Sequence, residues 1–159
     1  MKIFKYIISI VCMWSVLFLL NGCQRDCLFV DSFSFDKAKW NYNQPVIWEV
    51  DVEDTINTHH LSLFMRNNLE YPYSNIYFFT SIIYNDSVFL SDTSQYLIAD
   101  KYGRWLGRGF GGLKDNYFLM KENVVFPKRG KYTIRVTHGM RADDLQGVED
   151  LGIKIKNTF

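Results

Sequence analysis

Residues 46–53 read VIWEVDVE, and this stretch decides the fold class of the chain. Apolar side chains occupy every second position, and acidic side chains fill most of the positions between them. A period of two puts the apolar residues on one face of an extended strand and the charged residues on the other. The stretch therefore predicts an antiparallel β-strand with one face on a core and the other in water.

The same period recurs along the chain and predicts an all-β protein. It is seen at residues 61–65, 132–136 and 151–155, whereas residues 75–84 are apolar or aromatic on both faces and predict a central strand covered on both sides. Turn signals separate the runs at residues 41–45, 71–74, 85–87 and 127–130.

Seven or eight short strands at this spacing predict one antiparallel β-sandwich domain, either immunoglobulin-like or jelly-roll-like. Two segments are candidates for short helices, residues 116–122 and 142–148. The chain shows no internal repeat and no low-complexity linker, so a single domain is expected.

The start of the chain predicts a lipid anchor. Lys2 and Lys5 precede an apolar run, and residues 20–23 read LNGC, which resembles a bacterial lipobox. In that motif the cysteine thiol accepts a diacylglycerol, and cleavage before it frees an amine for a further acyl chain. We therefore predict a signal peptide of residues 1–22, acylation of Cys23, a tether of residues 23–27 and a β-sandwich domain of residues 28–159. The alternatives are an ordinary signal peptide or a single transmembrane anchor.

Charge and cysteine content exclude several classes of function. Loss of Lys2 and Lys5 with the signal peptide leaves one more acidic than basic side chain, so there is no basic excess for nucleic acid. With Cys23 acylated, Cys27 is the one free thiol of the mature chain. An internal disulfide and a thiolate metal cluster are therefore excluded, and stability is expected to come from packing of the many aromatic residues.

A glycine-rich segment, GRGFGG at residues 107–112, formally matches a dinucleotide-binding fingerprint. That function requires a preceding parallel strand and a following helix, which the sequence does not predict here. We interpret Gly107 and Gly109 as structural residues of a loop or bulged strand. Trp105, between Gly103 and Gly107, is predicted to plug one end of the sandwich.

No metal, cofactor or catalytic site is predicted. Adjacent His59 and His60 would point to opposite faces of a strand, and we expect these residues and His138 at the surface or at strand ends. The acidic pairs at residues 143–144 and 149–150 match no EF-hand, so caps and solvated turns explain them more simply than a calcium loop. No serine or cysteine lies in a recognisable nucleophile motif. We therefore expect a protein that is not an enzyme.

Several strings in fixed order resemble the GldH gliding-motility lipoproteins of Bacteroidetes. They are RN at residues 66–67, YPYSN at 71–75, DT at 92–93, LIADKYGRWLGRG at 97–109 and GMRADDLQGVEDLG at 139–152. The resemblance implies a lipoprotein required for gliding in species that glide, linked to the motility and type IX secretion apparatus. It implies no catalytic residues, and many members of the family occur in species that do not glide.

Arg66, Arg141 and Tyr73 are the candidates for partner contact, because arginine and tyrosine are enriched at interface hot spots. For each arginine, a structural ion pair or backbone contact is the alternative. The expected partners are the membrane, through acyl chains on Cys23, and other envelope or gliding-machinery proteins. Gln24 follows Cys23 where an aspartate would be the inner-membrane retention signal of enteric bacteria, so we expect the outer membrane.

Two further functions remain open at this stage. One is a lipid-anchored module that binds a glycan or a protein unrelated to motility, and the other is an envelope hydrolase with a cleft that the sequence does not reveal. Residues 54–56 (DTI) and 86–88 (DSV) also resemble the O-glycan acceptor pattern of the same phylum.

Overall fold

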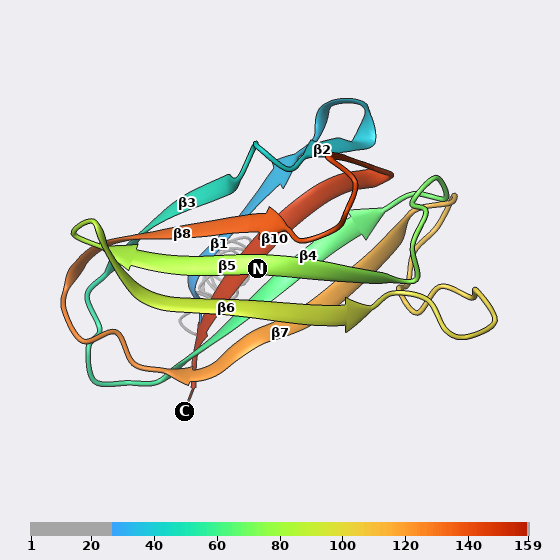
Figure 1. Ribbon diagram of the computed structural model, residues 1–159. Helices are drawn as coiled ribbons and strands as arrows, with labels where there is room; N and C mark the ends of the chain where they lie inside the picture. Colours follow the sequence, from blue (N-terminus) through green and yellow to red (C-terminus); the bar gives the residue numbers. More distant parts are fainter. Residues whose placement is uncertain (1–26, 159) are drawn as a thin grey trace, which may run out of the picture.

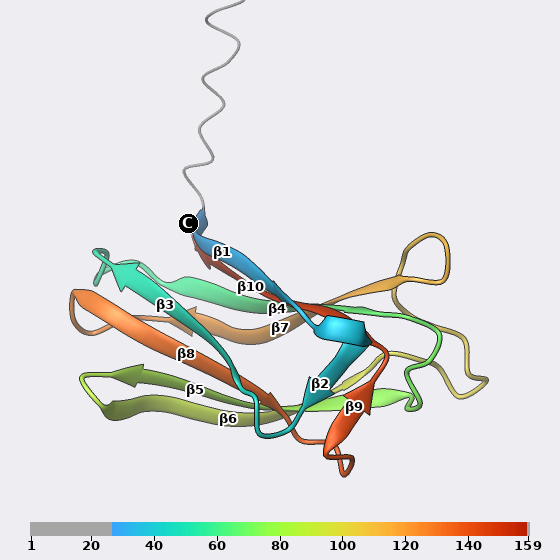
Figure 2. The same ribbon diagram turned by 90° about the horizontal axis from the view of Figure 1, so that it is seen from above.

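The computed structural model describes residues 27–158, which form two antiparallel sheets packed face to face (Figures 1 and 2). The predicted all-β sandwich is confirmed. The strands are β1 (Cys27–Ser34), β2 (Lys39–Asn41), β3 (Val46–Val52), β4 (His59–Asn67), β5 (Asn75–Tyr84), β6 (Ser87–Leu97), β7 (Lys114–Val124), β8 (Gly130–His138), β9 (Asp144–Gln146) and β10 (Val148–Asn157), with one 3-10 turn, η1 (Asp36–Ala38).

The strands pair as one long hairpin that has been rolled up. One sheet has the order β1-β10-β4-β7, the other has the order β3-β8-β5-β6, and β2 and β9 form a short ribbon. Counting from the two chain ends inward, β1 pairs with β10, β2 with β9, β3 with β8, β4 with β7 and β5 with β6. This nested order is that of a jelly roll, which decides between the two sandwich types that the sequence allowed.

The innermost turn of this hairpin is set by two residues. Asn85 and Asp86 have φ of 47° and 59°, so both lie in the left-handed region. Positive φ at both central residues defines a type I′ turn, whose twist matches that of the flanking strands. Asn and Asp adopt this conformation more readily than other non-glycine residues. The turn signal at residues 85–87 therefore positions β5 against β6.

The core lies between the two sheets and follows the period of two. Val46, Trp48, Val50 and Val52 of β3 are buried, while the residues between them are exposed. Trp40 of β2 is fully buried and packs on Phe78 of β5 with ring centroids 6.2 Å apart. Because the strand of residues 46–52 folds as predicted, its apolar face closes one side of this core.

Residues 75–84 form β5, which pairs with β6 on one side and β8 on the other, as expected of a central strand. Coverage on both faces was a wrong prediction. Ile76, Phe78 and Ile82 are buried, but Phe79 on the outer face is 43% exposed. Two layers cover only the inner face of each sheet, so the second apolar face of this strand belongs to the surface.

Both predicted helices are also wrong. Residues 116–122 lie within β7, where Asn116, Phe118 and Met120 point inward with the period of a strand. Residues 142–148 contain β9 and the first residue of β10. Ladder pairing with β4 and with β2 overrides the weak local preference in the two segments.

The glycine-rich segment runs as a loop along the edge of β7. Arg108 and Asp115 exchange backbone hydrogen bonds of 3.1 and 2.7 Å. A Cβ atom at Gly107 would lie 2.6 Å from Asn116 Oδ1, and one at Gly109 would overlap the carbonyl of Leu113. The close approach of the two backbones therefore requires glycine at both positions.

Trp105 lies at the rim of the domain and is only half buried. Its indole packs edge-to-face on Tyr71, with ring centroids 6.5 Å apart. The residue therefore covers one end of the core from outside, and the fully buried tryptophan is Trp40.

The histidines differ from the expected surface positions. His59 and His138 lie at strand ends as predicted, but both are fully buried. His59 packs on Phe126 with ring centroids 5.3 Å apart, and His138 packs on Trp40 at 5.1 Å. Both imidazoles serve as aromatic filling of the core, which composition and period do not distinguish from surface histidines.

We predict that Trp40 and Trp105 contribute differently to the free energy of unfolding. Trp40→Ala should lower the free energy of unfolding by about 3–5 kcal/mol, because it empties a closed core site. Trp105→Ala should cost only about 1–2 kcal/mol, because the indole is already partly solvated. Urea denaturation of the two purified variants measures the difference, and equal losses would contradict the placement of Trp105 at the rim.

We predict that the protein loses stability in acid through His138. Burial lowers the pKa of His138 below its ordinary value of 6.5, although Asp143 and Asp144 oppose this shift. The unfolded chain then binds a proton that the folded chain does not, so stability falls as the pH drops through about 6.5. His138→Phe should reduce this slope in urea denaturation at pH 8 and pH 5. The half-buried His60 supplies the control, and His60→Gln should keep the slope; an unchanged slope in His138→Phe would refute the assignment.

Candidate partner-binding surface

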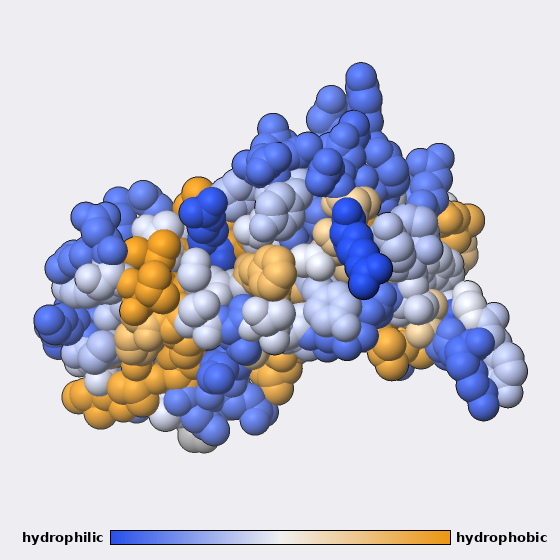
Figure 3. All heavy atoms as spheres, in the orientation of Figure 1, coloured by the Kyte–Doolittle hydropathy of each residue, from blue (hydrophilic) through white to orange (hydrophobic). Residues whose placement is uncertain are grey.

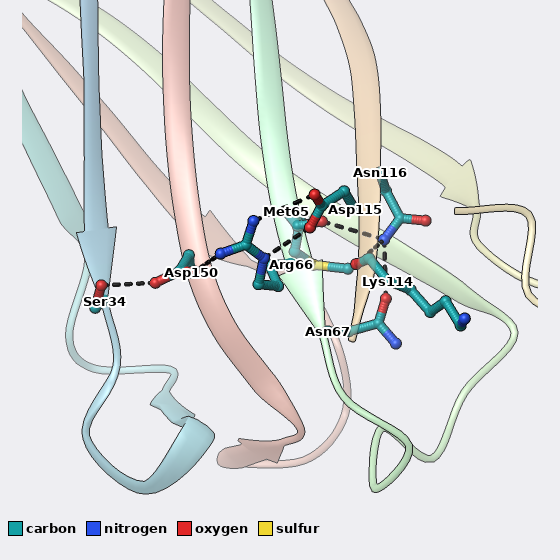
Figure 4. A network of polar contacts seen from close by, with 8 residues as sticks. All are labelled: Ser34, Met65, Arg66, Asn67, Lys114, Asp115, Asn116 and Asp150. Atoms are coloured by element: carbon teal, nitrogen blue, oxygen red, sulfur yellow. Dashed lines mark hydrogen bonds and ion pairs between the residues drawn. The ribbon is translucent and has the colours of Figure 1, made fainter. Parts of the chain in front are cut away.

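Arg66 lies in a polar row that crosses all four strands of the β1-β10-β4-β7 sheet (Figure 4). Its Nε donates to Asp115 Oδ1 at 2.7 Å and its Nη2 donates to Asp115 Oδ2 at 3.2 Å. On the other side, Arg66 Nη1 donates to Asp150 Oδ2 at 3.2 Å, and Ser34 Oγ donates to Asp150 Oδ1 at 2.6 Å. The row thus links β1, β10, β4 and β7 through side chains on the outer face.

The guanidinium of Arg66 is held by carboxylates on both neighbouring strands. The hydrogen bonds that Arg66 donates to Asp115 raise the pKa of Arg66, and the charge of Asp150 adds to the effect. Beneath the row, Asn116 Nδ2 donates to the Met65 carbonyl at 3.1 Å and to Asn67 Oδ1 at 2.8 Å. Arg66 therefore forms structural ion pairs, which were expected from the sequence as the alternative to partner contact. Contact of Arg66 with a partner stays a prediction.

Tyr73 and Arg141, the other two candidates, come together on the other sheet. They flank a hollow of about 520 Å³ at the beginning of β5, whose lining includes Tyr77, Phe79 and Met140. We call this the Tyr73–Arg141 hollow. Figure 3 shows the same outer face, where pale, weakly polar side chains lie over the middle of β5 and apolar ones gather toward the turn between β5 and β6.

The floor of this hollow is built by contacts between β5 and the segment after β8. The Gly139 amide donates to the Tyr77 carbonyl at 2.7 Å, and the Tyr77 amide donates to Met140 Sδ at 3.4 Å. A Cβ atom at Gly139 would lie 2.9 Å from Phe79 Cζ. Glycine at this position therefore lets the Phe79 ring lie against the end of β8.

The walls differ in character. Tyr73 is half buried and packs edge-to-face on Tyr71 at 6.0 Å, while the Tyr71 hydroxyl donates to the Asn75 carbonyl at 2.9 Å. Burial raises the pKa of Tyr71, so this ring stays neutral. Arg141 is exposed, and within residues 27–158 no carboxylate lies within ion-pair distance of it. The hollow therefore joins a rigid aromatic wall to an unpaired cation.

Sequence reasoning missed Tyr77, Phe79, Gly139 and Met140. The available signal was the second apolar face of residues 75–84, which was interpreted as buried. A two-layer sandwich has no third layer to cover that face, so its aromatic residues mark a surface.

The acidic strings near the C-terminus serve as pairing groups. Asp144 Oδ2 lies 2.7 Å from Lys39 Nζ, and Asn41 Nδ2 donates to Asp144 Oδ1 at 2.6 Å. These hydrogen bonds lower the pKa of Asp144. Among the described residues, no three His, Cys, Asp or Glu side chains are grouped in a way that could hold a metal ion.

A second aromatic surface lies on the sheet that carries Arg66. Phe64 and Tyr117 are neighbours on β4 and β7, with ring centroids 5.2 Å apart, and Tyr117 is 77% exposed. They border a hollow of about 550 Å³ over Gly152. The outer faces of the two sheets therefore each carry an aromatic depression.

Two of the predicted features concern the N-terminal segment. Cys23 lies outside the described residues, and Cys27 begins β1 with its thiol 3.4 Å from the Ile155 carbonyl. No helix in the described part of the chain is long and apolar enough to span a bilayer.

The residues predicted for glycosylation, Thr55 and Ser87, lie in the β3–β4 loop and beside the β5–β6 turn, and their modification stays a prediction.

Comparison with known proteins identifies the family to which the chain is similar. A family model described as GldH lipoprotein matches residues 28–155. The gliding motility lipoprotein GldH homolog of Christiangramia forsetii is 29% identical over 164 residues, covering 99% of this chain and 96% of the relative. The gliding motility lipoprotein GldH of Flavobacterium johnsoniae is 26% identical over 145 residues, covering 87% and 89%. Among solved structures, a family 35 carbohydrate-binding module from Cellvibrio japonicus has a TM-score of 0.37 at 13% identity, covering 87% of this chain and 94% of that one.

The family match extends over nearly all of the sandwich, and two relatives align with it over most of their own length. It agrees with the order of strings that the sequence itself presents. The chain belongs to the GldH lipoprotein family.

Proposed function

We propose that this protein is a lipid-anchored component of the cell envelope that helps to assemble a motility complex by contact and not by catalysis. Membership of the GldH lipoprotein family and the gliding-motility names of its relatives support this role. The single observation that carries the contact function is the Tyr73–Arg141 hollow, an exposed depression with aromatic walls. Aromatic residues, methionine and arginine are the types enriched at protein interfaces.

The proposed anchor is an acylated Cys23 after removal of residues 1–22. One acyl chain holds a protein only marginally to a bilayer, whereas two or three give stable attachment. Three residues lie between Cys23 and Cys27, where β1 begins, so the domain would lie close to the lipid surface. Gln24 after the acylated cysteine favours the outer membrane in this proposal.

A link to the type IX secretion apparatus belongs to the same proposal. It derives from the resemblance to the family, and the contact surface gives it a physical form. A domain fixed to the membrane at one point and carrying one docking hollow would hold a second envelope protein at a set distance from the lipid.

A second candidate is a glycan-binding module, which the Phe64–Tyr117 pair favours. The apolar face of a sugar ring can lie on an exposed aromatic ring. The polar row of Arg66 and its carboxylates lies two residues away from this pair along β4 and β7, where it could bind hydroxyl groups. This candidate uses the opposite sheet from the Tyr73–Arg141 hollow, so substitutions on the two outer faces separate the two functions.

The anchor is tested by Cys23→Ala. This change should abolish acylation and membrane retention and leave the fold intact, because the described strands begin after it. Metabolic labelling with an alkyne fatty acid, followed by membrane fractionation, measures both effects. Label that persists on the variant would overturn the lipobox assignment, and wild-type protein in the inner-membrane fraction would overturn the outer-membrane proposal.

The contact surface is tested by charge reversal at two exposed arginines, one in β8 and one in the segment that follows it. Arg141→Glu should lower the yield of crosslinked complex in native membranes at least tenfold, whereas Arg135→Glu, outside the hollow, should leave it unchanged. Arg66→Ala should instead lower stability by about 1 kcal/mol by breaking the polar row.

The crosslinking experiment also includes Tyr117→Ala, which should keep the wild-type yield. Loss of complex with Tyr117→Ala but not with Arg141→Glu would contradict the Tyr73–Arg141 hollow as the contact surface and would assign the protein contact to the opposite sheet. Unchanged yields in all the variants would contradict a contact function through either outer face.

A further inference from the structure

We infer that the Tyr73–Arg141 hollow binds a protein segment in which a carboxylate neighbours a bulky apolar side chain. This inference rests on the proposed contact function and names the chemistry of the partner. Two features of the hollow carry it: an unpaired guanidinium at the rim and an aromatic, sulfur-containing floor.

The charge of the hollow calls for a carboxylate. Elsewhere in the chain, an arginine that faces a carboxylate engages it closely, as Arg66 does with both oxygens of Asp115 and Arg104 does with Asp100 at 2.7 Å. Arg141 has no such partner among residues 27–158. A planar guanidinium with free donors at the edge of an apolar surface is suited to bidentate binding of an Asp or Glu side chain.

The floor calls for an apolar side chain beside that carboxylate. Phe79 is 43% exposed although it lies in the middle of a central strand, and Met140 lies over β5, where its sulfur accepts a hydrogen bond from the Tyr77 amide. A methionine beside rigid rings adapts to different apolar shapes. A volume of about 520 Å³ accommodates one or two bulky apolar side chains.

Position on the domain favours a protein over a lipid as the occupant. The start of β1, the end of β10, the start of β4 and the turn between β5 and β6 share one end, which we call the anchor end. The hollow lies near the beginning of β5, on the other sheet. Figure 2 shows the beginning of β1 on one side of the sandwich and β9, which follows Arg141, on the opposite side.

The lengths agree with that separation. Along β5, Tyr77 precedes Tyr84 at the anchor end by about 23 Å at roughly 3.3 Å per residue. The four Cα–Cα steps from Cys23 to Cys27 span about 14 Å when fully extended. A tether of this length holds Cys27 within about 14 Å of the lipid. The hollow lies toward the other end of β5 and on the opposite sheet from β1, where a protein segment can approach it from the aqueous side.

The test places a photocrosslinker in the hollow of the full-length protein in its native membrane. Thr93 lines the hollow and is exposed, so p-benzoylphenylalanine at this position leaves Tyr73 and Arg141 in place. Mass spectrometry then identifies the crosslinked peptide. We expect a protein segment with Asp or Glu within two residues of an aromatic or branched apolar residue.

Charge exchange makes the test specific. Arg141→Glu should reduce that crosslink at least tenfold, Arg141→Lys should reduce it less, and replacement of the partner's acidic residue by lysine should restore the crosslink to Arg141→Glu. Arg135→Glu is the matched control and should keep the wild-type yield. Failure of the restoring exchange would overturn the inference, as would an adduct with lipid, with glycan or with a segment that lacks a carboxylate.

A second probe position separates this inference from the proposed function. p-Benzoylphenylalanine at Tyr117 reports contacts of the opposite sheet. A protein adduct at position 117 with none at position 93 would overturn the inference and leave a contact function in place. The absence of protein adducts at both positions would overturn both.

Discussion

The nested antiparallel pairing that closes on the turn at Asn85 and Asp86 is the constraint on which the rest of the structure depends. Because β5 and β6 form the innermost hairpin, each outer pair is added around it, and the first and last described strands, β1 and β10, pair with each other. Pairs of this kind alternate between the two sheets, so each inner face is buried by strands distant in sequence. Aromatic contacts in the core, such as that between Trp40 and Phe78, form only because the rolled pairing brings β2 over β5.

The same pairing leaves the outer face of each sheet uncovered. Arg66 on one face and Arg141 beside the other differ in the contacts that their guanidinium groups make. On the β1-β10-β4-β7 sheet, Arg66 donates to Asp115 and Asp150, so the charge of Arg66 is already paired within the chain. Beside the β3-β8-β5-β6 sheet, Arg141 has no ion-pair partner among residues 27–158 and lies next to Phe79 and Met140. An arginine that is already paired gives little to a partner, whereas an unpaired guanidinium beside an apolar floor retains both electrostatic and apolar binding energy.

Two residues that the sequence marked for different reasons belong to one physical unit. Trp105 packs on Tyr71, and Tyr71 packs on Tyr73 at the edge of the hollow. The glycine-rich loop that carries Trp105 follows β7 closely because Gly107 and Gly109 have no side chains. A loop that looks like a nucleotide-binding motif therefore acts as support for an aromatic wall.

The sequence by itself determined the all-β class, the face of each alternating strand that is buried, the turn at residues 85–87 and the family, because period, turn chemistry and ordered strings are local properties. It misassigned residues 116–122, 142–148 and the outer face of β5, where local preference was weak and ladder pairing or layer number decided. Burial of His59 and His138 was equally hidden, since an imidazole fills an aromatic core as readily as it faces water. Only the tertiary structure joined Tyr73, Phe79 and Arg141 into one hollow, because its floor depends on a contact between Tyr77 and Met140, which lie 63 residues apart in the chain.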